Sequence, residues 1–348
     1  MIPADTYKTN RKHDKIILLI LAVAAFALFL FDLSFGSVKI PFSEVMDILT
    51  GGTPAKKAWE PIVFDSRLPQ SVMAIAAGIA LGISGLILQT YFRNPLAGPS
   101  VLGITSGASL GVAFFILGAG TFFTGLSLFS QSISLAMAAF AGAMVVMLLI
   151  MAFGKISPSP VTILVAGLMI SHFIGALVSI FEQWSNETQL QKFVFWGFGS
   201  FSGTTLHQSY GIALVIALLL FVSFILVKPL NANVLGEQYA RSMGISLSVF
   251  RWQVILITGL MAAIITAFCG PVAFVGMAVP HIARLFIRSS DHLILLPACA
   301  LTGMILCTLC SVITRLPLFE SDLPLNAVTS LMGAPVVIWI IIKQRQWR

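Results

Sequence analysis

Charged side chains are scarce in this 348-residue sequence, where Asp, Glu, Lys and Arg make up 9% of the chain, against about 25% in a typical soluble domain. Hydrophobic residues make up 58%, and the mean hydropathy is +0.98. One core cannot hide so much apolar surface, because most of a folded chain's surface still faces solvent. A water-soluble fold is therefore excluded, and we expect an all-α polytopic membrane protein.

The sequence also lacks the common catalytic motifs. It has no H-E-x-x-H, no G-x-S-x-G and no G-x-x-x-x-G-K-[ST] to cradle a nucleotide phosphate. Cys307 and Cys310 form a C-x-x-C pair, but no second pair or nearby His completes a zinc set, so we expect small buried side chains rather than a metal or redox site. We therefore predict no catalytic residue, no metal site and no cofactor, and if ATP drives this protein, another chain must bind it.

Apolar runs long enough to cross a bilayer, roughly 20 residues each, dominate the rest of the chain. We predict ten spans, at residues 16–35, 70–91, 100–119, 132–153, 161–181, 207–227, 250–268, 272–288, 293–314 and 324–342. The first run follows three basic residues and could be mistaken for a signal peptide, but it is long for one and nine more spans follow. We expect a single transmembrane domain over residues 1–348.

Lys and Arg are distributed unequally between the two sides of this topology. With the amino terminus inside, fourteen of the twenty fall on the cytoplasmic side. The other six are Lys39, Lys56, Lys57, Arg67, Lys192 and Arg315. The positive-inside rule therefore predicts both termini in the cytoplasm, with residues 1–15 as a cytoplasmic tail. The net charge of +7 reflects this topology and contact with anionic lipid, and nucleic acid is not an expected partner.

Acidic residues are missing from the middle of every predicted span. Carriers driven by protons or sodium usually place Asp, Glu or His there as relays and ligands. An ion-coupled secondary carrier is therefore the less favoured function. His172, near the middle of the fifth span, is the one titratable group at that depth. A packed histidine is the favoured interpretation, and a residue of the transport pathway is the alternative.

Glycines recur at spacing four in two spans. Gly103, Gly107 and Gly111 form a double G-x-x-x-G, and Gly78 and Gly82 form a single one. Small residues at this spacing let transmembrane helices approach closely. We expect tight helix packing at both places, with a moving interface as the alternative.

Two Gly-Pro pairs echo each other across the sequence. Gly98-Pro99 opens the third span and Gly270-Pro271 opens the eighth, on opposite sides of the predicted membrane. Five spans repeated with inverted orientation would produce this pattern. Gly-Pro pairs also simply break helices, so both interpretations stay open.

The cytoplasmic loop 228–250 contains a candidate surface helix. Glu237 and Arg241 are spaced to pair at i, i+4, and Gly244 can end the helix. A partner could push on such a helix. The alternative is a solvated amphipathic connector.

Several short runs resemble a known family. They are Ser66 to Pro69, Gly85 to Gln89, Phe92 to Pro99, Leu102-Gly103, Trp196-Gly197, Leu235 to Gly244, Gly270-Pro271, Phe274 to Gly276, Pro280 to Arg284, Asp291-His292, Leu296-Pro297, Leu323-Pro324 and Gly333 to Pro335. In order and spacing, these runs resemble the FecCD and BtuC type of permease subunit, found in ABC importers for ferric siderophores, haem and cobalamin. The resemblance covers Arg67 to Lys343, and the first 66 residues match only in outline.

The resemblance implies a set of partners. In this family a ten-span, BtuC-like permease pairs with a second copy in the bacterial inner membrane. Two ABC ATPase subunits below it use ATP and Mg, and a periplasmic solute-binding protein docks above it. The residues that match the family's structural motifs are Asn94, Pro95, Gly98, Pro99, Gly103, Gly270, Pro271, Pro280 and His281.

The resemblance also assigns roles to residues. The ATPase-coupling element would comprise Leu235, Gly236, Glu237, Ala240, Arg241 and Gly244. Arg67 and Arg315 would receive acidic residues of the binding protein, although Gln70 stands where many members have a further Arg, and snorkelling to the membrane interface is the alternative for both arginines. The inner gate would be Ser157, Ser159, Pro160, Val161 and Thr162, a stretch whose prolines also suit an ordinary turn.

The expected function is import of a bulky metal chelate by alternating access. Family breadth favours a ferric siderophore or haem, and cobalamin is the alternative solute. The alternatives from other classes are the ion-coupled secondary carrier and a membrane receptor that moves nothing.

Overall fold

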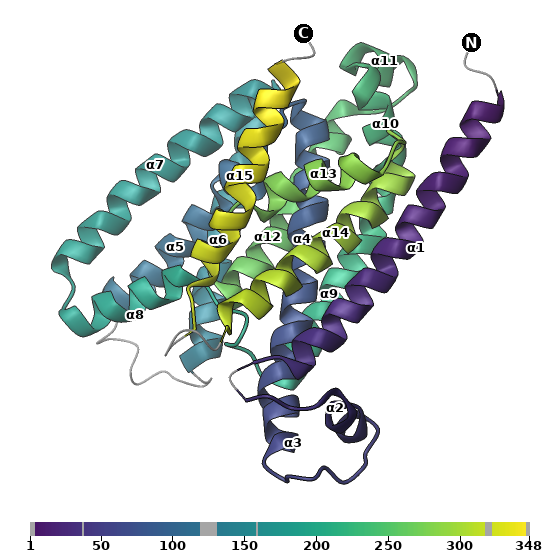
Figure 1. Cartoon of the computed structure of the whole chain (residues 1–348). Helices are drawn as coiled ribbons and strands as arrows, with labels where there is room; N and C mark the ends of the chain where they lie inside the picture. Colours follow the sequence, from purple (N-terminus) through teal and green to yellow (C-terminus); the bar gives the residue numbers. More distant parts are fainter. Residues whose placement is uncertain (1–3, 37, 119–130, 158, 317–321, 346–348) are drawn as a thin grey trace.

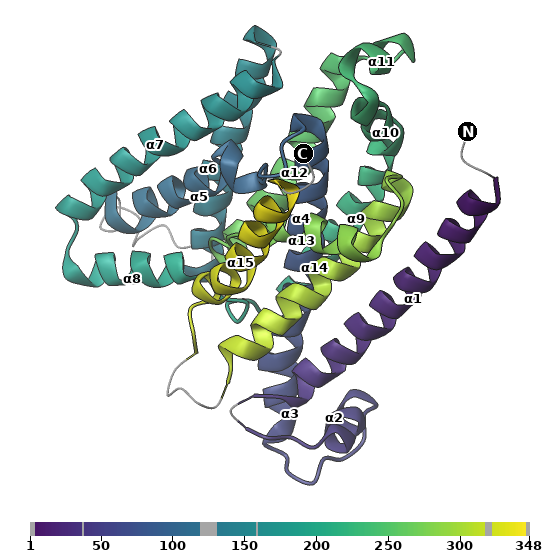
Figure 2. The same cartoon turned by 45° about the horizontal axis from the view of Figure 1, so that its top comes forward.

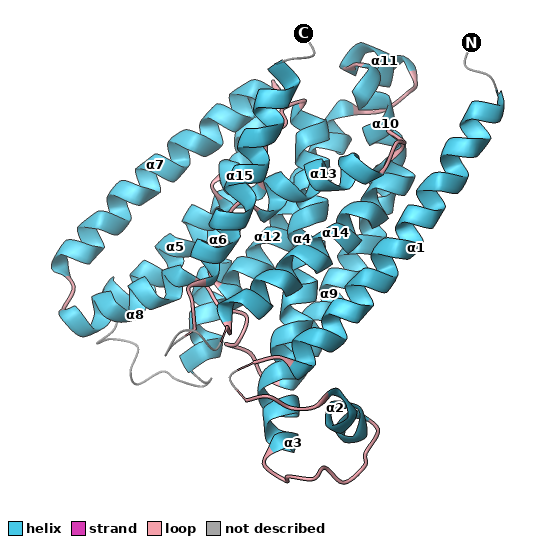
Figure 3. Cartoon of the chain, viewed as in Figure 1, coloured by secondary structure: helices cyan, strands magenta, loops and turns pink. Residues whose placement is uncertain are grey.

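The computed structural model describes residues 4–36, 38–118, 131–157, 159–316 and 322–345 of the chain. Over those residues it consists of helices and connecting loops, with no strand (Figure 3). The prediction of an all-α membrane protein is confirmed.

The helices pack together as one bundle (Figure 1). The α-helices are α1 (Ala4–Ser34), α2 (Phe42–Leu49), α3 (Trp59–Pro61), α4 (Leu68–Phe92), α5 (Ile104–Ala113), α6 (Gln131–Ile156), α7 (Pro160–Trp184), α8 (Glu187–Phe198), α9 (Leu206–Ser223), α10 (Val227–Leu235), α11 (Glu237–Ser242), α12 (Leu247–Cys269), α13 (Val275–Phe286), α14 (His292–Thr314) and α15 (Leu325–Arg345). Two π-helical turns, η1 (Ile62–Arg67) and η3 (Phe114–Gly118), and two 3-10 turns, η2 (Pro99–Leu102) and η4 (Phe224–Leu226), adjoin them.

Ten apolar helices correspond to the ten predicted spans, but they differ in length. Among the described residues, seven are long and apolar enough to cross a membrane. The other three are shorter apolar stretches, Ile104–Gly118, Val275–Phe286 and Leu325–Trp339. The prediction of about ten transmembrane helices is confirmed, although the third and eighth helices are shorter than predicted; α15 as a whole has 21 residues.

The eighth span is short because its first residues are unwound. Gly270 and Phe274 have positive φ angles of 72° and 62°, which end one helix and delay the next. Helix α13 has 12 residues, or about 18 Å at 1.5 Å per residue. The third span is interrupted in a similar way by Gly103, with φ of 79°. Short helices behind Gly-Pro breaks in the third and eighth positions fit an inverted repeat.

The predicted amino-terminal tail is helical from residue 4 onward. Helix α1 starts at Ala4, so residues 4–15 continue the first span as a helix. Asp14 is buried on this extension, and its carboxylate accepts a hydrogen bond of 3.1 Å from the backbone N–H of Arg288. This contact joins α1 to the segment before α14, and the cytoplasmic placement of residues 1–15 stays a prediction.

Helix α4 forms the centre of the bundle, with 83% of its apolar window buried. Its glycines permit backbone contact, because a Cβ built on Gly78 would lie 2.1 Å from the carbonyl oxygen of Gly303 on α14. Gly107 and Gly142 make a matching approach between α5 and α6, where the Cβ-to-oxygen distance would be 2.6 Å. The predicted packing role of the spaced glycines is confirmed. All four cysteines are buried and free, which confirms their expected packing role.

Helices α1, α7 and α9 lie at the edge of the bundle. Figures 1 and 2 place α1 and α7 on opposite sides of it. Only 22% of the apolar window of α7 is buried in the single chain. His172 lies exposed on this helix in the single chain, and the choice between a packed histidine and a pathway residue stays open.

The two ends of the bundle differ in what they carry. The start of α1, the end of α15 and the short helix α11 lie at one end, which we call the α11 end (Figure 1). Helices α2 and α3 lie at the opposite end, which we call the α2 end.

Candidate functional site

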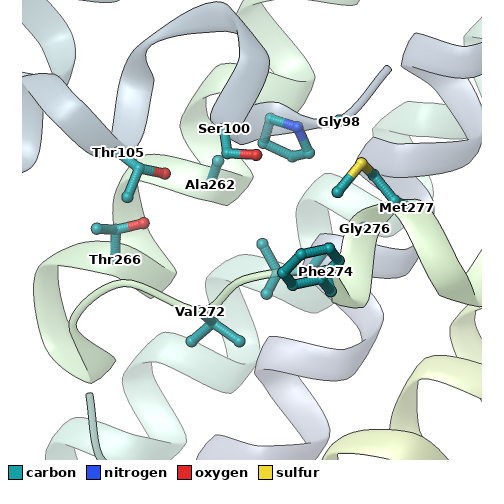
Figure 4. Close-up of a pocket in the computed structure, with 11 residues that line it drawn as sticks. Gly98, Ser100, Thr105, Ala262, Thr266, Val272, Phe274, Gly276 and Met277 are labelled. Carbon is teal, nitrogen blue, oxygen red and sulfur yellow. The ribbon is translucent and has the colours of Figure 1, made fainter. Parts of the chain in front are cut away.

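The two Gly-Pro breaks meet in the interior. A Cβ on Gly276 would lie 2.9 Å from Pro99 Cδ, and one on Gly85 would lie 1.7 Å from the carbonyl oxygen of Gly276. A space of about 10 Å³ lies beside them, near the hydroxyl-bearing side chains of Ser100 and Thr266 (Figure 4). This volume admits about one water molecule. The junction is thus a packing point between two broken helices, too small for a bulky solute.

The residues matching the family's structural motifs fix the connection from α4 to α5. The side chain of Asn94 accepts a hydrogen bond of 2.9 Å from the backbone N–H of Leu96. His281 Nε2 lies 3.0 Å from the carbonyl oxygen of Pro95. Pro280 precedes that histidine inside α13. These contacts join the connection to α13, so the two halves of the chain are bonded as well as packed.

The predicted coupling helix forms over six residues, as α11. Ala240, within this helix, is fully buried. Gly244, with φ of 79°, ends it through hydrogen bonds from Gly244 N–H to Arg241 O and from Ile245 N–H to Ala240 O, at 2.9 and 3.1 Å. This is a Schellman ending, and the predicted helix stop at Gly244 is confirmed.

The predicted ion pair on α11 does not form. No contact within 4.0 Å joins Glu237 to Arg241 in the described part of the chain. Arg241 is exposed, and exposed pairs at i, i+4 gain only a few tenths of a kcal/mol, too little to fix both side chains. The two charges therefore stay available at the surface of α11.

A polar network anchors α11 to the bundle through α10. Arg93 Nη2 donates to the carbonyl oxygen of Asn233 at 2.6 Å, and Asn233 Nδ2 donates to the carbonyl oxygen of Thr90 at 3.0 Å. His292 bridges Thr90 Oγ1, at 2.9 Å, and Asn231 Oδ1, at 2.6 Å. Helix α10 is thus bonded to the end of α4 and the start of α14, so a force on α11 reaches both spans.

The coupling helix and the predicted gate share one cavity. A space of about 250 Å³ lies between α11, the start of α7, the start of α12 and the end of α4. Glu237 and Arg241 line it from the coupling helix, and Ser159 lines it from the gate segment. The structure therefore brings together two groups of residues that lie about 80 positions apart in the sequence.

The gate segment itself is a tight connection between α6 and α7. Ser157 N–H bonds to Phe153 O at 2.9 Å, and Ser159 is extended before Pro160 starts α7. Val161 and Thr162 follow in the first turn, with exposed side chains. Pro158 lies outside the described residues. The geometry suits an ordinary turn as well as a gate, and the gating role stays a prediction.

Of the two predicted docking arginines at the α2 end, Arg67 is buried and Arg315 is partly buried. Arg67 is 3% exposed and donates to the carbonyl oxygens of Leu33, at 2.8 Å, and Val38. Arg315 forms an ion pair with Asp32 on α1. Docking of a binding protein on these two arginines therefore stays a prediction. Gln70 is buried too, so its difference from the family pattern does not alter an exposed surface.

Asp32 organises this buried cluster, and sequence reasoning did not assign it a role. Its two carboxylate oxygens accept hydrogen bonds from Arg315 and from the hydroxyl of Ser71. The cluster joins α1, α4 and α14. The signal that could have revealed it is an acidic residue at the end of the first span, on the same predicted side as Arg67 and Arg315.

Replacing Asp32 by Asn is expected to destabilise the protein. The change leaves the nearly buried Arg315 without a counter-charge, at a cost of about 2 kcal/mol. Thermal unfolding in detergent should show a lower midpoint for Asp32→Asn. The exposed Asp65→Asn, on η1, serves as the control and should unfold like the wild type. An unchanged midpoint for Asp32→Asn would contradict the ion-pair network.

Comparison with known proteins identifies relatives over most of the chain. The model of the FecCD transport family matches residues 20–343. The vitamin B12 import system permease protein BtuC of Salmonella typhi is 34% identical over 285 residues, covering 82% of this chain and 84% of that protein. The protein of the same name from Salmonella enteritidis PT4 is similar to the same extent.

Two solved structures are also similar to this chain. A structure described as the inward-facing conformation of a metal-chelate type ABC transporter superposes with a TM-score of 0.81 and 26% identity, over 94% of this chain and 99% of that one. PsaBC from Streptococcus pneumoniae, solved with a Fab, has a TM-score of 0.55 and 16% identity over 86% of this chain and 94% of that one, a likeness of fold alone. The family match, the relatives and the ten apolar helices agree: this chain belongs to the FecCD transport family and is a multi-pass permease subunit of an ABC transporter, not an enzyme.

Proposed function

We propose that this permease imports a bulky metal chelate, and that ATP hydrolysis by two partner ATPase subunits, which use Mg, drives the transport. The observation that carries the proposal is α11, a short helix with two unpaired charges on its surface and a bonded attachment to the spans behind it. Rigid elements transmit displacement better than solvated loops. An ATPase that moves α11 would therefore move α4 and α14 with it.

The inner gate is proposed to respond to the same movement. Ser159 and α11 line one cavity, so a shift of α11 changes the packing at the start of α7. Helices α7 and α15, the fifth and tenth apolar helices, would then rearrange around the path of the solute. Alternating access of this kind needs no chemistry on the solute and no cofactor on this chain.

A second copy of the chain is the proposed neighbour of α7. This helix exposes Val165, Leu168, Met169 and Phe173 in the single chain, and an apolar face of this size suits a helix interface or lipid. The path of the solute would lie between the two copies. His172 on this face is then a candidate pathway residue.

The orientation is proposed from charge. The α11 end would face the cytoplasm of a bacterium, with both termini, and the α2 end would face the periplasm, from which a solute-binding protein docks. Docking of the binding protein on Arg67 and Arg315 stays a prediction, and it requires that both side chains become accessible. Asp32 and the backbone carbonyls of residues 33 and 38 would first have to release the two guanidinium groups. Lys39, Lys56, Lys57 and Lys192, which the predicted topology places on the same side, are exposed.

The solute is proposed at the level of a class. The breadth of the family favours a ferric siderophore or haem, whereas the names of the two Salmonella relatives favour cobalamin as the second candidate. All three are bulky chelates of a metal, and the metal-chelate transporter with the same fold supports that class.

Stimulation of ATPase activity would assign the solute. The chain is reconstituted in liposomes with its cognate ATPase, and binding proteins loaded with ferric siderophore, haem or cobalamin are added in turn. We expect one loaded binding protein to stimulate hydrolysis and the same protein without solute to stimulate it less. An assembled complex that responds to none of the three would contradict the proposed solute class.

A further inference from the structure

The cavity beside α11 contains a buried arginine without a counter-charge. Arg251, on the first turn of α12, is 8% exposed and lines this space of about 250 Å³. Its guanidinium donates to the carbonyl oxygen of Gly154, but its Nε has no hydrogen-bond partner. No carboxylate lies within 4.0 Å of it in the parts of the chain that are described.

Burying a charged group is costly unless it is paired and hydrogen-bonded. One backbone carbonyl leaves most of the five guanidinium donors to be satisfied by other groups. The cost of burying Arg251 would fall steeply if an anion occupied the adjacent cavity. Because Nε itself is enclosed, an anion in the cavity would act as the counter-charge of the guanidinium as a whole.

A second cation lies at the rim of the same cavity. Arg241 is exposed and lines the space from α11, where it forms no ion pair with Glu237. Among the lining residues, the two guanidinium groups exceed the single carboxylate of Glu237, so the cavity carries a net positive charge. The hydroxyl-bearing residues Tyr91 and Ser159 and the amide-bearing Asn233 complete its polar lining.

We propose that this cavity is a binding site for a phosphate group, carried by an anionic lipid headgroup or by inorganic phosphate. Two guanidinium groups favour phosphate because their planar fork matches its oxygens, and charge-assisted bonds of this kind are strong. The cavity has room for more than one water molecule and too little for a large solute. The proposal concerns a ligand of the coupling region and does not depend on which solute is transported.

The test uses the purified full-length chain in two kinds of nanodisc. Discs of phosphatidylcholine with phosphatidylglycerol are analysed by native mass spectrometry for retained lipid. Discs of phosphatidylcholine alone are analysed by equilibrium dialysis with radiolabelled inorganic phosphate. Arg251→Gln and Arg241→Gln remove the two cavity cations. Arg288→Gln removes an exposed cation outside the cavity and is the matched control.

We expect the wild type to retain phosphatidylglycerol over phosphatidylcholine or to bind phosphate. Each cavity variant should weaken that binding about tenfold, which corresponds to one charge-assisted hydrogen bond, and the control should not. Retained lipid identifies the headgroup as the source, and phosphate binding in pure phosphatidylcholine identifies the free ion. Absence of both, or an equal loss in the control, would overturn the proposal.

Glu237→Gln provides a second, independent readout on a partly exposed residue. If an anion occupies the cavity, removal of the neighbouring carboxylate should tighten its binding severalfold, because like charges repel. Anion binding that is unchanged or absent in Glu237→Gln would overturn the proposal. This arm remains informative if Arg251→Gln fails to fold.

Discussion

Gly78→Ala is expected to prevent accumulation of folded protein. The added Cβ would lie 2.1 Å from the carbonyl oxygen of Gly303 and 2.6 Å from the backbone nitrogen of Met304. Both atoms belong to the backbone of α14, so no side chain can turn aside, and α4 must separate from α14. Overpacking of this kind costs at least about 3 kcal/mol. Yield after detergent extraction and the elution profile on size exclusion measure the effect.

Gly211→Ala is the matched control for that substitution. Gly211 lies in α9, and a Cβ built there meets no atom within 4 Å. Ala is about 1 kcal/mol more favourable than Gly inside a helix, so this variant should be at least as stable as the wild type. Wild-type yield and elution for Gly78→Ala would mean that α4 and α14 do not approach as closely as the structure has them.

Replacing both Glu237 and Arg241 by Ala is expected to abolish solute uptake while the protein still folds. Neither side chain forms an ion pair in the described structure, and Arg241 is exposed, so the stability cost should stay within about 0.5 kcal/mol. Loss of interface contacts worth about 2 kcal/mol would weaken engagement of the ATPase about thirtyfold. ATP-dependent uptake into proteoliposomes, at matched protein density, measures the change.

Arg288→Gln serves as the control for the coupling variant because it removes an exposed cation outside α11. It should retain wild-type uptake. Copurification of the ATPase shows whether lost uptake results from weaker ATPase binding or from another defect. We expect the double variant to bind its ATPase more weakly. Normal uptake by the Glu237 and Arg241 double variant would exclude α11 as the coupling element. A wild-type chain that binds its partners but shows no uptake to lose would agree instead with a receptor that moves nothing.

Much of the fold could be predicted from local sequence signals. Apolar run length predicts seven of the long spans, and glycines at spacing four predict the contacts of α4 with α14 and of α5 with α6. Helix α11 and its end at Gly244 could also be predicted, because a Schellman ending depends on a glycine and its immediate neighbours.

The lengths of the third and eighth helices could not be predicted in this way. Hydropathy stays high through residues 270–274, although the backbone there is unwound by positive φ angles at Gly270 and Phe274. The start of α13 that follows packs at Gly276 against Pro99 and Gly85 from the other half of the chain. A contact between residues that lie far apart in the sequence leaves no local pattern.

Burial of charge was the other feature that the sequence did not reveal. Arg67 and Arg315 lie on the predicted outer side, where exposed cations are expected. Asp32 and the carbonyl oxygens that follow it satisfy both guanidinium groups. Arg251 differs from these two arginines because its guanidinium has no carboxylate partner. The sequence places it on the cytoplasmic side but gives no sign of the cavity beside it. Both depend on three-dimensional placement.

Energy coupling in proteoliposomes tests the central claim most directly. The chain and its cognate ATPase are reconstituted with ATP enclosed, the loaded binding protein is added outside, and uptake is followed with an uncoupler or with vanadate. Our account predicts uptake that requires ATP, survives the uncoupler and stops with vanadate. Uptake by the chain without any ATPase, which follows an ion gradient and collapses with the uncoupler, would contradict it and identify a secondary carrier.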